Sequence, residues 1–95
     1  MDNNGSAFAF QFFGILTIDK EADYIFYSNS NDGSRILIDN KIVVDNDGPH
    51  GMKEESGKIF LKSGYHIIEV QYFQNGGGKG LEVFMEGPGL IKHKI

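Results

Sequence analysis

The chain has 95 residues, a formal net charge of −4 and no cysteine. This length supports one domain, expected over residues 1–95 with a polar tail at 1–6, and a hydrophobic fraction of 40% fits a globular protein. The acidic balance argues against nucleic acid, because phosphate binding needs clustered Lys and Arg. The lack of cysteine excludes disulfides and thiolate metal sites, and no apolar stretch approaches the roughly 20 residues of a membrane span.

Short runs rich in Phe, Ile, Val and Tyr are separated by clusters of Gly, Asn, Asp and Ser, which indicates an all-β chain. The expected strands are, in chain order, 8–18, 24–29, 35–38, 42–44, 58–61, 65–72 and 81–86. Gly14 interrupts the first and longest run, so we expect a bulge or bend there. Asp39-Asn40 predicts a tight hairpin turn, and the segment 62–64 predicts a second turn.

Period-2 alternation is clearest near the end of the chain. In "YHIIEVQY" the residues Ile68, Val70 and Tyr72 share one face, while Glu69 and its odd-numbered neighbours share the other. The segment "LEVFME" at 81–86 alternates in the same way. One packed face and one solvent-exposed face predict an antiparallel β-sandwich or flattened barrel.

The sequence gives no positive case for an enzyme. Its histidines are far apart, and no HExxH motif or Ser/His/Asp set stands out. The glycine run at 76–80 continues into a strand, so it fits a hairpin loop better than a phosphate-binding loop. His66, in an alternating strand, is expected to be partly buried and hydrogen-bonded. His50 lies in a loop where a turn or packing role is the default.

Two acidic loops carry the strongest chemical signal. The segments "NSNDGS" at 29–34 and "DNDGPHG" at 45–51 are rich in side-chain oxygens. One interpretation is Asx turns, in which these oxygens accept backbone N–H groups. The other is a Ca²⁺ site, because Ca²⁺ takes six to eight oxygen ligands. The match to an EF-hand loop is poor.

Taken in order, several segments resemble the PA14 domain family. "FGIL" at 13–16 and "DYIF" at 23–26 precede "NDGSRILIDNK" at 31–41, which is similar to the family's "DDGSRLYIDG". The similarity continues through "VDNDGPHG" at 44–51, "LKSGYH" at 61–66, "VQYF" at 70–73, "GGG" at 76–78 and "EGPG" at 86–89. Each segment alone is weak, but their order and spacing over about 10–89 are specific.

The resemblance implies a PA14-like module of the kind found in glycosidases, adhesins and toxins. Several members bind carbohydrate, and in the adhesins a Ca²⁺ ion on two adjacent aspartates and a second loop bridges the protein to sugar hydroxyls. In this sequence the implied metal ligands are Asn31, Asp32 and Asn75. The carbohydrate site is expected at one end of the sandwich, and its candidate residues are Asn31, Asp32, Asp47, His50, Asn75 and Lys79.

The sequence departs from the family in three ways. Asn31 replaces one carboxylate, so Ca²⁺ binding should be weaker. The family has further strands ahead of the point where this chain starts, and an uncovered sheet edge would favour self-association. Finally, the chain has no Trp. The aromatic residues left as sugar platforms, each with packing as the alternative, are Tyr27, Tyr65, Phe73 and Phe84.

We therefore expect a non-catalytic carbohydrate-binding accessory module of an exported glycan-active protein. Its partners would be a glycan and a neighbouring catalytic domain, and its location extracellular, periplasmic or on the cell surface. The alternative is a structural or protein-interaction module without a sugar site, which covers or positions that neighbouring domain.

Overall fold

The computed structural model describes residues 8–31, 33–46, 53–74 and 80–95, and within these ranges every regular element is a β-strand. The strands are β1 (Phe8–Ile18), β2 (Ala22–Asn31), β3 (Gly33–Ile38), β4 (Lys41–Asn46), β5 (Lys53–Leu61), β6 (Gly64–Gln74), β7 (Gly80–Gly87) and β8 (Leu90–Lys94). All seven expected strands are present, and β8 is an addition. The described ranges contain no helix long and apolar enough to cross a membrane.

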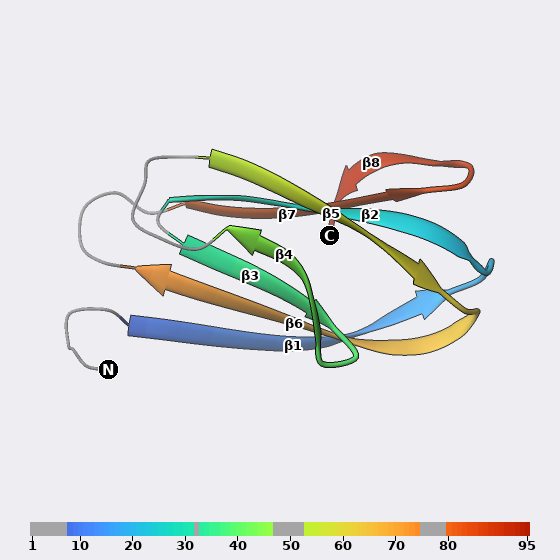
Figure 1. The fold of residues 1–95 in the computed structure, drawn as a ribbon, viewed down its shortest axis with the longest axis horizontal. Helices are drawn as coiled ribbons and strands as arrows, with labels where there is room; N and C mark the ends of the chain where they lie inside the picture. The colour runs from blue at the N-terminus through green and yellow to red at the C-terminus, as the bar shows by residue number, and fades with distance from the viewer. Residues whose placement is uncertain (1–7, 32, 47–52, 75–79) are drawn as a thin grey trace.

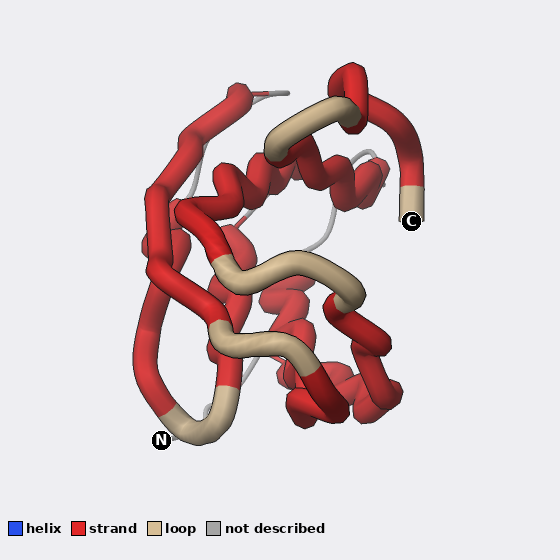
Figure 2. Tube along the Cα trace, turned by 90° about the vertical axis from the view of Figure 1, so that its right-hand side faces the viewer, coloured by secondary structure: helices blue, strands red, loops and turns tan. Residues whose placement is uncertain are grey.

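The strands form two four-stranded antiparallel sheets (Figures 1 and 2). The first, which we call the β1 sheet, has the order β1-β6-β3-β4, and the second, the β2 sheet, has the order β5-β2-β7-β8. β1 pairs with β6 and β2 pairs with β5 and β7, so strands far apart in the chain lie side by side. The predicted antiparallel β-sandwich is confirmed.

The core lies between the two sheets and follows from the alternation of side chains. Phe26 of β2, Ile36 and Ile38 of β3 and Val44 of β4 are completely buried. Tyr72 and its even-numbered neighbours on β6 face the same core, as the sequence predicted. Burying a side chain of this size contributes roughly 1.5–3 kcal/mol, so these positions hold the two layers together.

The predicted turns are confirmed, but β1 has no bulge at Gly14. Asp39 and Asn40 have φ angles of 50° and 69°, as a tight hairpin between β3 and β4 requires, and Gly64 has a φ of 124°. The pairing of β1 with β6 runs through Gly14 without a shift in register, so the expectation of a bulge there was wrong. Instead, a Cβ at Gly14 would lie 3.4 Å from Ile68, which shows that this position packs closely against β6.

The sandwich is closed on one side, where β4 meets β5. A Cβ at Gly57 would lie 1.8 Å from the backbone oxygen of Val43, so only glycine lets the two edge strands approach this closely.

On the opposite side β1 and β8 are the edges of their sheets. A slot of about 340 Å³ opens there, lined mainly by apolar side chains that include Phe12, Val70 and Val83.

Candidate functional site

The six strand ends that border residue 32 and the segments 47–52 and 75–79 lie together at one end of the sandwich, on the left of Figure 1. β2 ends at Asn31, opposite Gly80 at the start of β7. β4 ends at Asn46, opposite Ser34 near the start of β3. The end of β6 and the start of β5 lie at the same end. We call this part of the molecule the loop end.

Of the residues predicted for the site, the structure places Asn31, which is the last residue of β2 and is half-buried. The other five predicted residues lie outside the described residues, namely Asp32, Asp47, His50, Asn75 and Lys79. The strand ends that border them do converge at the loop end. The loop predicted over 29–34 is shorter than expected, because β2 continues to Asn31 and β3 begins at Gly33.

Directly beneath the loop end, three serines join the two sheets. Ser28 and Ser30 point inward from β2, Ser34 points inward from β3, and all three are completely buried. The hydroxyl of Ser34 is hydrogen-bonded to that of Ser28 and, at 2.7 Å, to that of Ser30. Because buried hydroxyls are costly unless they are paired, these bonds require the two sheets to stay in a fixed relation at this end.

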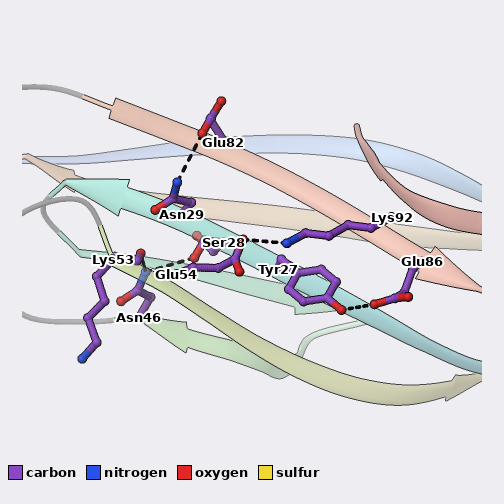
Figure 3. A network of polar contacts seen from close by, with 9 residues as sticks. All are labelled: Tyr27, Ser28, Asn29, Asn46, Lys53, Glu54, Glu82, Glu86 and Lys92. Atoms are coloured by element: carbon purple, nitrogen blue, oxygen red, sulfur yellow. Dashed lines mark hydrogen bonds and ion pairs between the residues drawn. The ribbon is translucent and has the colours of Figure 1, made fainter.

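Asn46 extends this buried network to β4 and β5 (Figure 3). Its side chain is 2% exposed, and its Nδ2 donates to the backbone oxygens of Lys53 at 2.6 Å and of Ser28 at 3.1 Å. The same Nδ2 lies 3.3 Å from the hydroxyl of Ser30. Asn46 is the last residue of β4 and Lys53 the first of β5, so the amide holds the two strand ends that border the segment 47–52.

Tyr72 fixes the other half of the loop end. This buried residue of β6 donates its hydroxyl proton to the backbone oxygen of Asn31, and its oxygen accepts the N–H of Gly80 at 3.1 Å. Asn31 and Gly80 face each other where the pairing of β2 with β7 ends. The phenol of one sheet therefore holds a strand end of the other, next to both the Asn31 position and the segment 75–79.

Sequence reasoning missed these supporting residues. The signal was present, because the alternation of Tyr24 and Phe26 on β2 places Ser28 and Ser30 on the inward face as well. Small polar residues at inward positions next to a strand end indicate a buried hydrogen-bond network rather than a turn. Tyr72 was expected on the packed face, but nothing in its sequence context identified the partners of its hydroxyl.

Two of the four candidate sugar platforms lie under a lysine. On the outer face of the β2 sheet the Nζ of Lys92 lies 4.0 Å from the ring centre of Tyr27 and 5.2 Å from that of Phe84. The same Nζ is held by Glu54 at 2.9 Å (Figure 3). The Tyr27 hydroxyl donates to Glu86, so both its ring and its polar tip are engaged. These contacts favour the packing alternative for Tyr27 and Phe84.

The other two candidate platforms lie at opposite ends of the β1 sheet. Phe73, near the loop end, carries the guanidinium of Arg35 at 5.3 Å from its ring centre, and Arg35 also pairs with Asp45 at 3.4 Å. Tyr65 is 79% exposed but lies near the start of β6, far from the loop end. Phe73 is therefore a predicted aromatic residue that lies near the loop end, paired with Gly33, and its ring is partly covered.

The described residues supply one member of the implied Ca²⁺ ligand set. Asn31 carries oxygen atoms, the ligand type that Ca²⁺ prefers. Because its backbone oxygen already accepts the Tyr72 hydroxyl, the side-chain amide oxygen is the atom that it can most readily offer a cation. Elsewhere in the ranges 8–31, 33–46, 53–74 and 80–95, no three His, Asp or Glu side chains gather as a metal site would require.

His66 is near the start of β6, and so lies away from the loop end, where β6 finishes. Figure 2 shows the molecule from this opposite end. Its Nδ1 is 2.6 Å from Asp39 Oδ2 and its Nε2 is 2.7 Å from the backbone oxygen of Lys62. Both ring nitrogens face acceptors, so only the imidazolium satisfies both. The hydrogen bond with Asp39, and then that with Lys62, raise the pKa of His66, while the same bond lowers the pKa of Asp39. The predicted hydrogen-bonded, partly buried histidine is confirmed.

The family of the chain follows from comparison with known proteins. The model of the PA14 domain matches residues 2–90, which is nearly the whole chain. The chain belongs to the PA14 domain family. The resemblance inferred from the short motifs is thereby confirmed. A comparison with curated proteins gives no match.

Solved structures support the same fold. The PA14 sugar-binding domain from an RTX adhesin is 24% identical, with a TM-score of 0.83, over 97% of this chain and 52% of that one. An anti-sigma factor domain-containing protein from Clostridium clariflavum is 25% identical, with a TM-score of 0.82, over 90% of this chain and 29% of that one. A β-glucosidase from Kluyveromyces marxianus is 21% identical, with a TM-score of 0.71, over 83% of this chain and 11% of that one. This PA14 chain thus spans about half or less of each of these solved chains.

Proposed function

We propose that this PA14 chain is a non-catalytic carbohydrate-binding module whose sugar site lies at the loop end. The observation that carries the proposal is the convergence of six strand ends there, fixed from beneath by Ser34, Asn46 and Tyr72. Such a rigid base suits binding groups carried on the segments between strands. The similarity to a structure described as a PA14 sugar-binding domain supports the same assignment.

In the proposed site, Ca²⁺ would be held by Asn31, Asp32 and Asn75. When bound, the ion would polarise vicinal sugar hydroxyls and hold them in place of water. The remaining proposed contacts, which would hydrogen-bond the sugar, are Asp47, His50 and Lys79. Because Asn31 contributes an amide where a carboxylate would add charge, we expect weak binding of both cation and sugar. A Kd for one monosaccharide between about 0.1 and 1 mM corresponds to roughly −4 to −6 kcal/mol.

The test is a thermal melt with and without Ca²⁺, followed by a glycan array. Ca²⁺ at about 100 times its Kd should stabilise the chain by roughly 2.7 kcal/mol, which raises Tm by on the order of 10 °C or more for this size. Asp32→Ala should abolish this rise and the binding of arrayed glycans. The matched control is Asp19→Ala, because Asp19 is an exposed aspartate in the turn between β1 and β2 at the opposite end. A rise that survives Asp32→Ala would refute the assigned ligand.

A second function has its own supporting observation. The outer face of the β1 sheet exposes several large apolar side chains, among them Phe13 at 67%, Ile67 at 53% and Tyr65 at 79%. Exposed apolar patches mark interaction surfaces, so this face supports a structural module that covers or positions a neighbouring domain. No binding to any arrayed glycan, together with no change of Tm in Ca²⁺, would favour this second function over the first.

The proposed setting of the module is a larger exported protein. The solved chains that it resembles are all longer than the segment they share with it, and they include an adhesin and a β-glucosidase. We infer that the module accompanies a glycan-active catalytic domain outside the cell, in the periplasm or at the cell surface. Detection of the parent protein in the culture medium or on intact cells would test this location.

A further inference from the structure

The edge strands of the sandwich differ sharply in charge. A sheet edge presents unpaired backbone groups, and proteins protect such edges with charged residues, proline or bulges. β4 carries Lys41 and Asp45, β8 carries Lys92 and Lys94, and the fourth edge strand, β5, is likewise rich in Lys and Glu. Three of the four edges in the described part of the chain are therefore protected against pairing with another strand.

β1 is the exception. Its sequence FAFQFFGILTI contains no charged residue, no histidine and no proline, which is true of no other of the eight described strands. It is 11 residues long, and its pairing with β6 runs from end to end without a register shift. β1 is thus a long, regular edge strand with none of the features that prevent a further strand from pairing with it.

The side chains next to this edge are apolar on both faces of the sheet. Phe12, on the inner side, is 53% exposed and borders the slot between the sheets. Phe13 and Ile15, on the outer side, are 67% and 66% exposed. An added strand would cover these side chains on both faces while it satisfied the backbone, so the free energy of pairing would come from both sources.

We propose that the outer edge of β1 binds β1 of a second copy of this chain, antiparallel, and joins the two β1 sheets into one eight-stranded sheet. The chemistry of the edge selects this occupant. A complementary strand should be uncharged and apolar on both faces, and in the described part of the chain only β1 itself has that character. Pairing of β1 with its own copy about a two-fold axis is closed, so assembly stops at the dimer.

The first test compares two lysine substitutions by sedimentation equilibrium over about 1–200 µM, a range chosen to span micromolar dissociation constants. The wild-type chain should have twice the monomer mass of 10.6 kDa at the upper end of this range. Phe13→Lys should raise the dimer Kd by about tenfold or more, because it removes buried apolar area and places a charge near the edge. The matched control, Ile91→Lys, changes an 85% exposed residue on the already charged β8 and should leave Kd unchanged.

Both substitutions alter exposed side chains, and circular dichroism will verify that each variant is folded. A monomeric wild-type chain throughout the range would overturn the proposal. So would assembly that continues beyond the dimer, or a dimer that Ile91→Lys disrupts as strongly as Phe13→Lys does.

A cysteine scan supplies an independent measurement, because the chain has no cysteine of its own. Single substitutions from Gln11→Cys to Thr17→Cys would be oxidised and the yield of disulfide dimer measured. A two-fold axis through the β1 pair predicts that the yield of disulfide dimer is highest at one position, where a residue faces its own copy. The yield should decline on both sides of that position. Equal yields at every position, or a higher yield from Ile91→Cys, would overturn the antiparallel pairing.

The dimer has a consequence for recognition that rests on the proposed function. β1 begins at the loop end and finishes at the opposite end, so antiparallel pairing points the two loop ends in opposite directions. Such a dimer would link two separate glycan-bearing surfaces rather than bind one surface twice. Agglutination of glycan-coated beads by the wild-type chain, lost in Phe13→Lys, would report this property. Sedimentation reports the dimer whether or not sugar is bound, so failures of the two proposals are distinguishable.

Discussion

Replacement of Tyr72 by Phe tests whether the loop end is held from beneath as described. The substitution keeps the buried ring and removes the hydroxyl, which bonds the backbone oxygen of Asn31 and the N–H of Gly80. Both backbone groups then lose a partner at the point where β2 and β7 stop pairing. The change therefore isolates the polar contribution of Tyr72 from its packing.

The expected magnitude follows from the cost of unpaired buried groups. Leaving one buried donor or acceptor unsatisfied costs about 1–3 kcal/mol. Because Asn31 and Gly80 are only half-buried, water can replace part of the loss, and we expect about 2 kcal/mol for Tyr72→Phe. For a domain of this size that corresponds to a fall in Tm of about 8–16 °C.

Differential scanning calorimetry or a circular dichroism melt measures this change directly. Tyr65→Phe is the matched control, because Tyr65 is 79% exposed and its hydroxyl should be free to bond water. We expect Tyr65→Phe to melt within about 2 °C of wild type, as surface substitutions usually do. If Tyr72→Phe also melts in that range, the hydroxyl does not hold the loop end and the reasoning is refuted.

Two further predictions concern other parts of the fold. His66→Gln should destabilise the chain more at pH 5.5 than at pH 8.5. Because the pKa of His66 is raised in the folded chain, its contribution to stability is complete below the pKa of the unfolded chain, near 6.5, and is lost as pH rises through the pKa of the folded chain. The lowered pKa of Asp39 keeps that partner charged at both pH values. Urea unfolding at the two pH values measures this, and an equal effect at both would contradict it. Gly57→Ala should lower stability by about 3 kcal/mol or more, because its Cβ would meet the backbone of Val43 at 1.8 Å. In Gly14→Ala the new Cβ would lie 3.4 Å from the side chain of Ile68, so stability should change by less than about 1 kcal/mol. Similar unfolding midpoints for the two variants would be evidence against the close approach of β4 and β5.

Much of the fold could be predicted from local chemistry. The alternation around Ile68 and Tyr72 identified the packed face, and the tolerance of Asp39 and Asn40 for positive φ identified the hairpin. β8 was missed because it is short and ends in Lys-His-Lys, a composition that suits an edge strand but leaves only two adjacent apolar residues and no alternation. The choice of strand partners could not be predicted either, because pairing across long separations leaves no local pattern.

The candidate site was predicted less completely than the fold. The run of Asn, Ser and Asp near residue 30 indicated turn chemistry, whereas Ser28 and Ser30 are inward-facing members of a strand. A serine can bond to the backbone of a turn or to another side chain in the core, and sequence alone does not separate the two. Only the approach of Ser34 and Asn46 from the other sheet decides between them.

The pairing of β1 with β6 also has a consequence for the synthesis of the chain. Ile18 and its partner Gly64 are 46 residues apart, and Phe8 and Gln74 are further apart still. At translation rates of about 5–20 residues per second, β1 leaves the ribosome roughly 2–10 s before its partner does. During that interval β1, which is the only one of the described strands without a charged residue, would be exposed without its partner and therefore prone to aggregation. Slower translation between β1 and β6 would therefore lower the yield of folded protein, although the finished sandwich would be unchanged.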